Sequence, residues 1–206
     1  MATASRERFR RLFQPPADAV FDHIESAYAE PARRYHTLEH IGECLAQLDA
    51  VVRPEPARRR IELALWWHDA VYDPTRSDNE AQSAVLARGH LSGLAEPAEE
   101  IDEVARLIAL TAGHTVASGD DVGATLVSID LAILGQSPDA YDRYAAQVRA
   151  EYAHVPDAAF RAGRAQVMAR FLDTPAIYSD PEFRDRLEAA ARANIAREVA
   201  ALTTTV

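Results

Sequence analysis

Prolines divide this chain into segments that each have the length of one helix. Alanine and leucine are abundant, the 206 residues hold 11 prolines but only 8 glycines, and runs of β-branched residues are short. No stretch alternates polar and apolar residues as a half-buried strand does. We therefore expect an all-α bundle of eight or nine helices. The first six have the approximate ranges 17–29, 38–52, 57–72, 78–91, 97–114 and 124–134, and the others begin at Ser137-Pro138, at Pro156 and at Pro181.

The length fits one domain that spans residues 1–206. Within it we expect a core at about residues 35–135 and a C-terminal helical extension at about residues 136–200. A homodimer is compatible with this layout.

Composition excludes several classes of protein. The net charge is −10, which argues against binding to a nucleic-acid polymer. The chain has no lysine, which excludes Schiff-base and P-loop lysine chemistry. No run reaches the roughly 18 apolar residues of a membrane span, and the N-terminus lacks the apolar core of a signal peptide. The single cysteine, Cys44, fits a reducing compartment, so we expect a cytoplasmic protein.

Three polar side chains fall on the apolar faces of three different expected helices. His68, in the run Leu65-Trp66-Trp67-His68-Asp69, continues one apolar stripe. Asp130 interrupts a second stripe, and His114 ends a third. A carboxylate on an apolar face is costly unless a cation pairs with it. Convergence of these helices would therefore create an interior site for a cation.

The histidines and carboxylates that could bind a cation also have interpretations without a ligand. His36 and His40 lie four residues apart and could be a capping histidine and a buried core histidine. His68-Asp69 could be a core histidine beside a surface carboxylate, and Asp130 could pair with a buried arginine. The metal site is the leading hypothesis because it explains all of them together.

The order His, His-Asp and distant Asp resembles the HD superfamily of metal-dependent phosphohydrolases. The resemblance implies an HD-type helical domain in which His40, His68, Asp69 and Asp130 bind a divalent metal ion, which could be Mn, Mg, Fe, Co, Ni or Zn. It implies hydrolysis of a small-molecule phosphate ester, such as a nucleotide or related metabolite, by attack of metal-bound water. Further segments resemble a bacterial group of predicted HD phosphohydrolases without settled substrates, namely residues 35–36, 69–73, 79–80, 130–135, 148–152 and 163–164.

The same resemblance suggests roles for other residues. His36 would protonate the leaving oxygen, and Asp73 would orient the attacking water. Tyr72 departs from the Glu-Asp pair of HD alarmone hydrolases, which argues against that substrate class. His114 would contact phosphate, or would join Glu80 at a second metal ion. The arginines expected to bind phosphate are Arg33, Arg149 and Arg164.

Two alternatives remain open at this point. His36-Thr37-Leu38-Glu39-His40 also matches the H-x-x-E-H motif of zinc peptidases, in which both histidines bind zinc and Glu39 is the general base. That motif leaves His68, Asp69 and Asp130 unexplained. The chain could also be a catalytically silent HD fold that serves as a binding or scaffold module.

Overall fold

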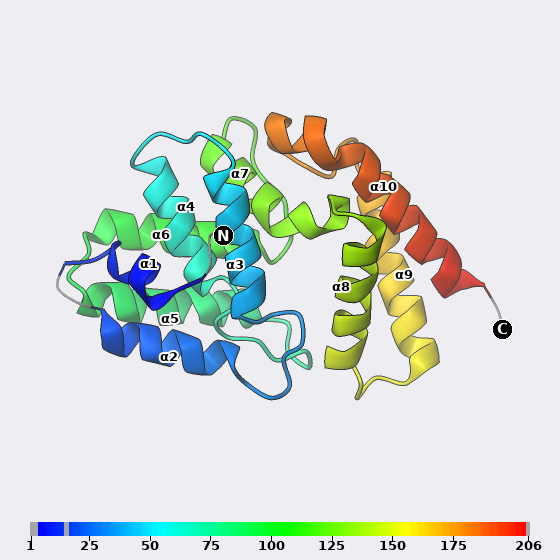
Figure 1. The fold of residues 1–206 in the computed structure, drawn as a ribbon, viewed down its shortest axis with the longest axis horizontal. Coiled ribbons are helices and arrows are strands. Elements are labelled where there is room, and N and C mark those ends of the chain that lie inside the picture. Colours follow the sequence, from blue (N-terminus) through cyan, green and yellow to red (C-terminus); the bar gives the residue numbers. More distant parts are fainter. Residues whose placement is uncertain (1–3, 15–16, 205–206) are drawn as a thin grey trace. The chain divides into compact units, whose positions relative to one another are not determined.

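The computed structural model describes residues 4–14 and 17–204, and over these ranges it contains helices and no strand. The all-α fold class is therefore confirmed, with a helix count close to the expected one. The α-helices are α1 (Arg6–Arg10), α2 (Asp18–Tyr28), α3 (Leu38–Asp49), α4 (Ala57–Trp67), α5 (Asn79–Gly93), α6 (Ala98–Leu110), α7 (Asp121–Asp130), α8 (Pro138–Glu151), α9 (Asp157–Asp173) and α10 (Pro181–Thr203), and η1 (Leu131–Gly135) is a 3-10 helix (Figure 1).

The chain divides into two compact units, Met1–Val127 and Ser128–Val206. The division falls within α7, which runs without interruption from one unit into the first residues of the next. We expected the C-terminal extension to begin at about residue 136. The assignment of the whole chain to one domain stays a prediction.

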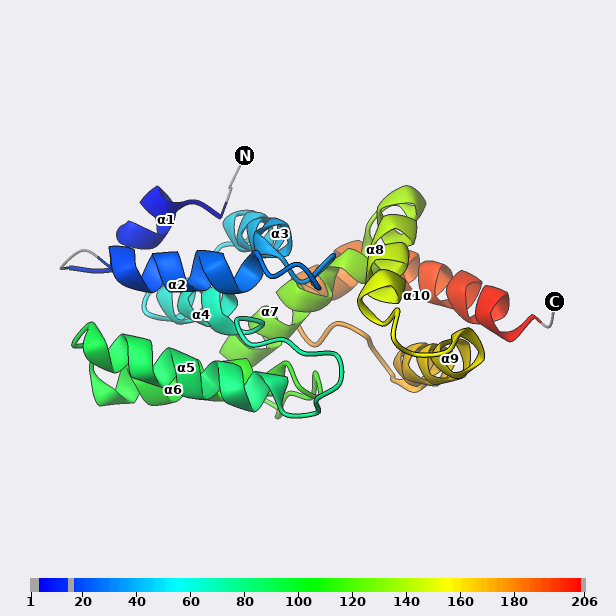
Figure 2. The same ribbon diagram turned by 90° about the horizontal axis from the view of Figure 1, so that it is seen from below.

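The core of the first unit is built around α4, whose residues Ile61–Trp67 are all buried. This helix packs against α3, α5 and α6, and α5 lies alongside α6 (Figure 2). Phe9 from α1 meets Trp66 edge-on, with ring centroids 5.2 Å apart, and also contacts Trp67. Burial of each large apolar side chain stabilises the fold by roughly 1.5–3 kcal/mol.

Helix α4 ends at Trp67, earlier than the expected end near residue 72. Side chains of α5 take over the backbone hydrogen bonds beyond this point. The Val71 amide donates to Ser83 Oγ at 3.0 Å, and the Asp73 amide donates to Asn79 Oδ1 at 3.1 Å. Asn79 Nδ2 in turn donates to the Asp73 carbonyl at 2.9 Å. These tertiary partners replace the bonds that a longer helix would have made.

Prolines begin the helices of the second unit as predicted. Ser137 and Asp180 cap the N-termini of α8 and α10 with side-chain oxygens, and each is followed by a proline at the first helical position. Helix α10 packs against α9 and η1. Gly135 ends η1, where a Cβ would lie 2.6 Å from Leu187 Cβ, so only glycine fits this close approach.

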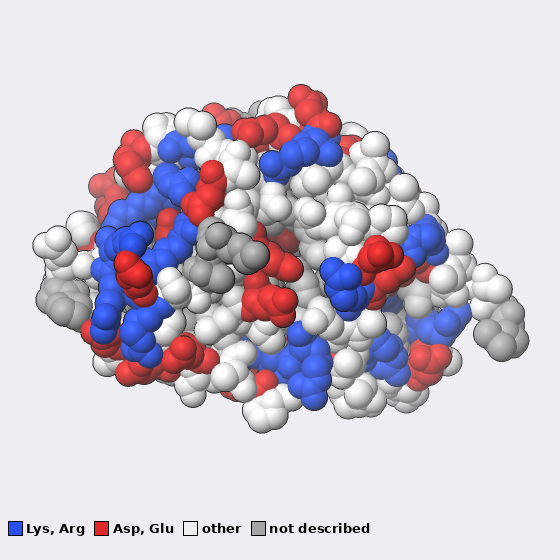
Figure 3. Space-filling model, in the orientation of Figure 1, with Lys and Arg blue, Asp and Glu red and all other residues white. Residues whose placement is uncertain are grey.

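Arginines and carboxylates are interspersed on the face shown in Figure 3. In the first unit Arg8 donates to Asp49 and to Glu62, both at 2.7 Å. Arg6 pairs with Asp22 at 2.5 Å. Such pairs keep the negative charge of the chain locally compensated. Within the described ranges no helix is both long and apolar enough to cross a membrane.

A pair of histidines joins α2 to α5 beside the core of the first unit. Trp67 Nε1 donates to His90 Nδ1 at 3.0 Å, so this ring nitrogen carries no proton. His90 Nε2 lies 3.0 Å from His23 Nδ1 and donates the hydrogen bond between the two rings. Burial, followed by the neighbouring His23, lowers the pKa of His90. Folding therefore favours the neutral imidazole.

We expect the first unit to lose stability as the pH falls below about 6.5, the usual pKa of histidine. The unfolded chain then takes up a proton that folded His90 resists, so the loss continues until the pH falls through the lowered folded-state pKa. Urea denaturation at pH 7.5 and 5.5, followed by tryptophan fluorescence, measures this unit alone because its Trp66 and Trp67 are the two tryptophans of the chain. His90→Gln should reduce the pH dependence, whereas His154→Gln in the second unit should retain it. An equal decline in His90→Gln would contradict the assignment.

Candidate metal centre

Two histidines come together from neighbouring helices of the first unit. The Thr37 hydroxyl caps α3 by accepting from the Glu39 amide at 3.3 Å, which places buried His40 in the first turn. His68 follows the last residue of α4 and is 1% exposed. Their Nε2 atoms lie 3.3 Å apart. The buried apolar segment Leu63–Trp67 is thus followed directly by His68, whose ring lies beside a second imidazole.

Asp69 brings a carboxylate to the same point. Its Oδ2 lies 3.0 Å from His68 Nε2 and 3.7 Å from His40 Nε2. Ligand atoms that share a metal ion at 2.0–2.2 Å lie about 2.8–3.6 Å from one another in tetrahedral or octahedral geometry. The three observed separations are close to this range, so the donor atoms are spaced as the ligands of one ion would be.

The hydrogen bonding of His68 also calls for a cation here. His68 Nδ1 lies 2.9 Å from the Leu65 carbonyl, which can only accept, so Nδ1 carries a proton. A neutral imidazole then directs the lone pair of Nε2 towards the Asp69 carboxylate. Two acceptors at 3.0 Å repel each other unless a cation lies between them. A proton can join only two atoms, whereas a metal ion can satisfy all three.

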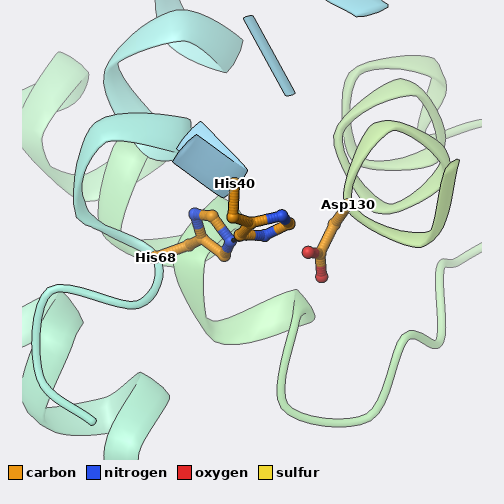
Figure 4. Close-up of side chains that lie close together, drawn as sticks. All are labelled: His40, His68 and Asp130. Carbon is orange, nitrogen blue, oxygen red and sulfur yellow. Dashed lines mark hydrogen bonds between the residues drawn. The ribbon is translucent and has the colours of Figure 1, made fainter. Parts of the chain in front are cut away.

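Asp130, the last residue of α7, offers a second carboxylate. Its carboxylate and the two imidazoles each supply a ligand atom, and these atoms all lie within 4.8 Å of one another. Figure 4 shows the three side chains pointing towards one another. The residues present thus fit a divalent ion with mixed nitrogen and oxygen ligation.

A cysteine thiol and a tyrosine ring lie next to the His40 imidazole. Cys44 Sγ lies 3.7 Å from His40 Nε2 and 3.8 Å from Nδ1, as expected for residues four apart on a helix. The ring of Tyr35 lies 4.7 Å from the His40 ring, centroid to centroid. Both neighbours are buried, and they restrict the orientation of the imidazole.

His36 lies outside α3, and its ring stacks on Tyr72 with centroids 4.1 Å apart. The centroids of His36 and His40 are 6.2 Å apart, and Glu39 is exposed. The H-x-x-E-H peptidase motif needs both histidines on one ion. The group of three potential ligands found among the described residues includes His40 and not His36, and the peptidase alternative stays a prediction. His36 lies beside His40, and its expected role as a proton donor stays a prediction.

Asp73 lies in the loop after α4, where its Oδ1 accepts from the Thr75 amide at 2.8 Å and from the Thr75 hydroxyl at 2.7 Å. His114 follows α6 with a φ of +50°, and Glu80 lies in the first turn of α5. The group of three potential ligands found among the described residues includes neither His114 nor Glu80. The roles expected for these three side chains also stay predictions.

Arg33 is 4% exposed, and its guanidinium donates to the carbonyls of Asp69 and Ala70 at 2.6 and 2.9 Å. These donors are directed at carbonyl oxygens of the chain itself. The phosphate-binding role expected of Arg33 stays a prediction.

The two arginines of the second unit also make contacts within that unit. Arg149 donates to the carbonyls of Tyr152 and Val155 at 2.8 and 3.2 Å. Arg164 pairs through Nε with Glu198 at 2.9 Å, and both side chains are nearly buried. The Tyr141 hydroxyl donates to the same carboxylate. The phosphate-binding roles expected of Arg149 and Arg164 stay predictions.

No protein-family model, curated protein or solved structure matches this chain. The site formed by His40, His68, Asp69 and Asp130 is therefore interpreted from its own geometry.

Arg164→Met should destabilise the second unit by about 3–5 kcal/mol, because it leaves the carboxylate of Glu198 buried without its cation. Urea denaturation followed by circular dichroism measures the loss. Arg170→Met, at an exposed position of the same helix, should change the free energy of unfolding by no more than about 0.5 kcal/mol. Metal binding in Arg164→Met should equal that of the wild type. A weaker metal affinity with unchanged stability would contradict the structural role.

Asp130→Ala should abolish retention of the metal ion, because it removes one of two carboxylates that offset the ion's charge. Elemental analysis of untagged protein after metal loading and gel filtration is the measurement. About one ion per chain is expected for the wild type, and Asp139→Ala, at the start of α8, should match it. Full occupancy in Asp130→Ala would remove Asp130 from the ligand set.

Proposed function

We propose that this protein is a metal-dependent phosphohydrolase of the HD type, which hydrolyses a phosphate ester of a nucleotide or related metabolite in the cytoplasm. The observation that carries the proposal is the convergence of His40, His68 and Asp69 at ligand-like separations, with Asp130 as the fourth ligand. The His, His-Asp, Asp order of the sequence supports the same class of enzyme.

The four side chains would bind the ion, and the bond from His68 Nδ1 to the Leu65 carbonyl would fix which ring nitrogen faces it. When bound, a divalent ion lowers the pKa of a coordinated water and polarises a phosphoryl oxygen. Two carboxylates balance the charge of such an ion, so an anionic ester meets a site that is locally far less negative than the whole chain.

His36 would act as the general acid in this proposal. Its ring is held by stacking on Tyr72, and the rings of His36 and His40 lie 6.2 Å apart. A protonated imidazole at this distance could transfer its proton to the leaving oxygen of the ester. Asp73, held in the loop by Thr75, would accept a hydrogen bond from the attacking water.

A substrate panel tests the proposal. Protein loaded separately with Mn, Mg, Co, Ni, Fe or Zn would be assayed for phosphate or nucleoside release from nucleotides, phosphomonoesters and phosphodiesters. Turnover that depends on the metal and disappears in Asp130→Ala supports a phosphohydrolase. If metal-loaded protein hydrolyses none of the substrates, the proposed enzymatic function is wrong. Binding of a nucleotide without turnover would favour a scaffold.

His36→Ala should lower kcat on the order of 10²–10⁴-fold, because a general acid contributes about that much, and should retain the metal ion. Steady-state kinetics and elemental analysis of one preparation separate the two effects. His154→Ala is a matched control, since His154 also stacks on a tyrosine, Tyr152, with an interplanar angle of 25°. An empty site in His36→Ala would show that His36 is a ligand.

A further inference from the structure

Arg33 is a buried cation in the segment between α2 and α3. Its side chain is 1% exposed. Burial of a guanidinium is costly unless its donors are satisfied and its charge is balanced. The structure therefore has to provide partners for Arg33, and these partners lie next to residues of the metal centre.

The guanidinium joins two segments that each carry residues of the centre. Nη1 donates to the His36 carbonyl at 3.2 Å and to the Asp69 carbonyl at 2.6 Å. Nη2 donates to the Ala70 carbonyl at 2.9 Å. One planar group thus fixes the backbone just before α3, which bears His40, relative to the turn that bears Asp69.

The guanidinium is itself held in place. Nε donates to Glu30 Oε2 at 3.2 Å, and the rings of Tyr28 and Tyr72 lie 5.1 and 5.5 Å from the guanidinium carbon. Tyr28 donates its hydroxyl to the Trp66 carbonyl at 3.2 Å, and burial raises the pKa of that hydroxyl well above its usual value. The Arg33 guanidinium therefore contacts the last turn of α4 through Tyr28, and it contacts the carbonyls of Asp69 and Ala70 directly.

We propose that Arg33 is a positioning residue of the metal centre, an inference that rests on the proposed function. By holding the Asp69 carbonyl, Arg33 sets the direction of the Asp69 side chain. By holding the His36 carbonyl, it sets where α3 begins and hence the place of His40. The donor atoms are thereby kept at ligand separations before an ion binds.

A lysine does not provide the same restraint. Its ammonium is compact and lies on a flexible stem, whereas the arginine fork presents donors in one rigid plane to three carbonyls. Arg33→Lys therefore keeps the charge and loses the geometry. Comparison with Arg33→Met separates the effect of the charge from the effect of the fork.

Arg59 provides a matched control in the same unit. It lies on α4, donates to the Leu12 carbonyl at 2.9 Å and to Glu96 at 2.6 Å, and lies 5.9 Å from the ring of Phe13. It thus resembles Arg33 in its kinds of partners. None of these partners is one of the proposed ligands, so Arg59→Met should cost stability without changing the centre.

The experiment uses Co²⁺ as the probe with the full chain. The dissociation constant is measured by competition with a chelator, and the visible absorption spectrum of bound Co²⁺ reports the coordination geometry. We expect Arg33→Met to bind Co²⁺ about 10–100-fold more weakly, with an altered spectrum. Arg33→Lys should be intermediate, and Arg59→Met should match the wild type in affinity and spectrum.

Each other outcome overturns the inference in a recognisable way. Wild-type affinity and spectrum in folded Arg33→Met would exclude a positioning role, and if that variant does not fold, the same result in Arg33→Lys would do so. Equal weakening in Arg59→Met would assign the effect to general stability. If the wild type itself binds no Co²⁺, that result contradicts the proposed metal-dependent function, and with it the positioning role of Arg33.

Discussion

The burial of Ile61–Trp67, the C-terminal part of α4, is the constraint on which the first unit depends. A helix leaves its last carbonyls without partners of its own, and at a buried end no bulk water can satisfy them. Tyr28 donates a hydrogen bond to the Trp66 carbonyl, and Arg33 donates to the carbonyls of Asp69 and Ala70. The Ser83 hydroxyl accepts from the Val71 amide. A polar region thus forms at the end of an apolar helix, and His68 and Asp69 lie within it.

Much of the fold could be predicted from the sequence, because prolines and capping residues act locally. Pro138 and Pro181 begin helices where predicted, and the phase of the apolar residues placed His68 in the interior. The end of α4 could not be predicted in this way. It is set by Arg33, Ser83 and Asn79, which contact residues 69–73 only after the chain has folded. Two of the carbonyl partners of Arg33 were missed for the same reason, since Asp69 and Ala70 lie more than thirty residues further along the chain.

The cap of α3 determines where His36 and His40 lie relative to each other. The spacing of four residues would place His36 and His40 on one helical face only if the helix began before His36. Thr37 caps α3, so His36 lies in the preceding segment and stacks on Tyr72 instead. The two histidines thereby have different surroundings, one among the donor atoms and one beside them. The sequence contained the capping threonine, but the stacking of His36 on Tyr72 could be found only in the structure.

His68 and Asp69 are consecutive, yet both side chains reach one point. Successive residues of an α-helix diverge by about 100° around its axis, so two neighbours within a regular helix cannot direct their side chains at a common centre. The approach of the two side chains therefore depends on the end of α4 at Trp67. Any substitution that propagated α4 by one more turn would improve local helix geometry while pulling Asp69 away from its partner. In this segment regular secondary structure and ligand geometry are in direct competition.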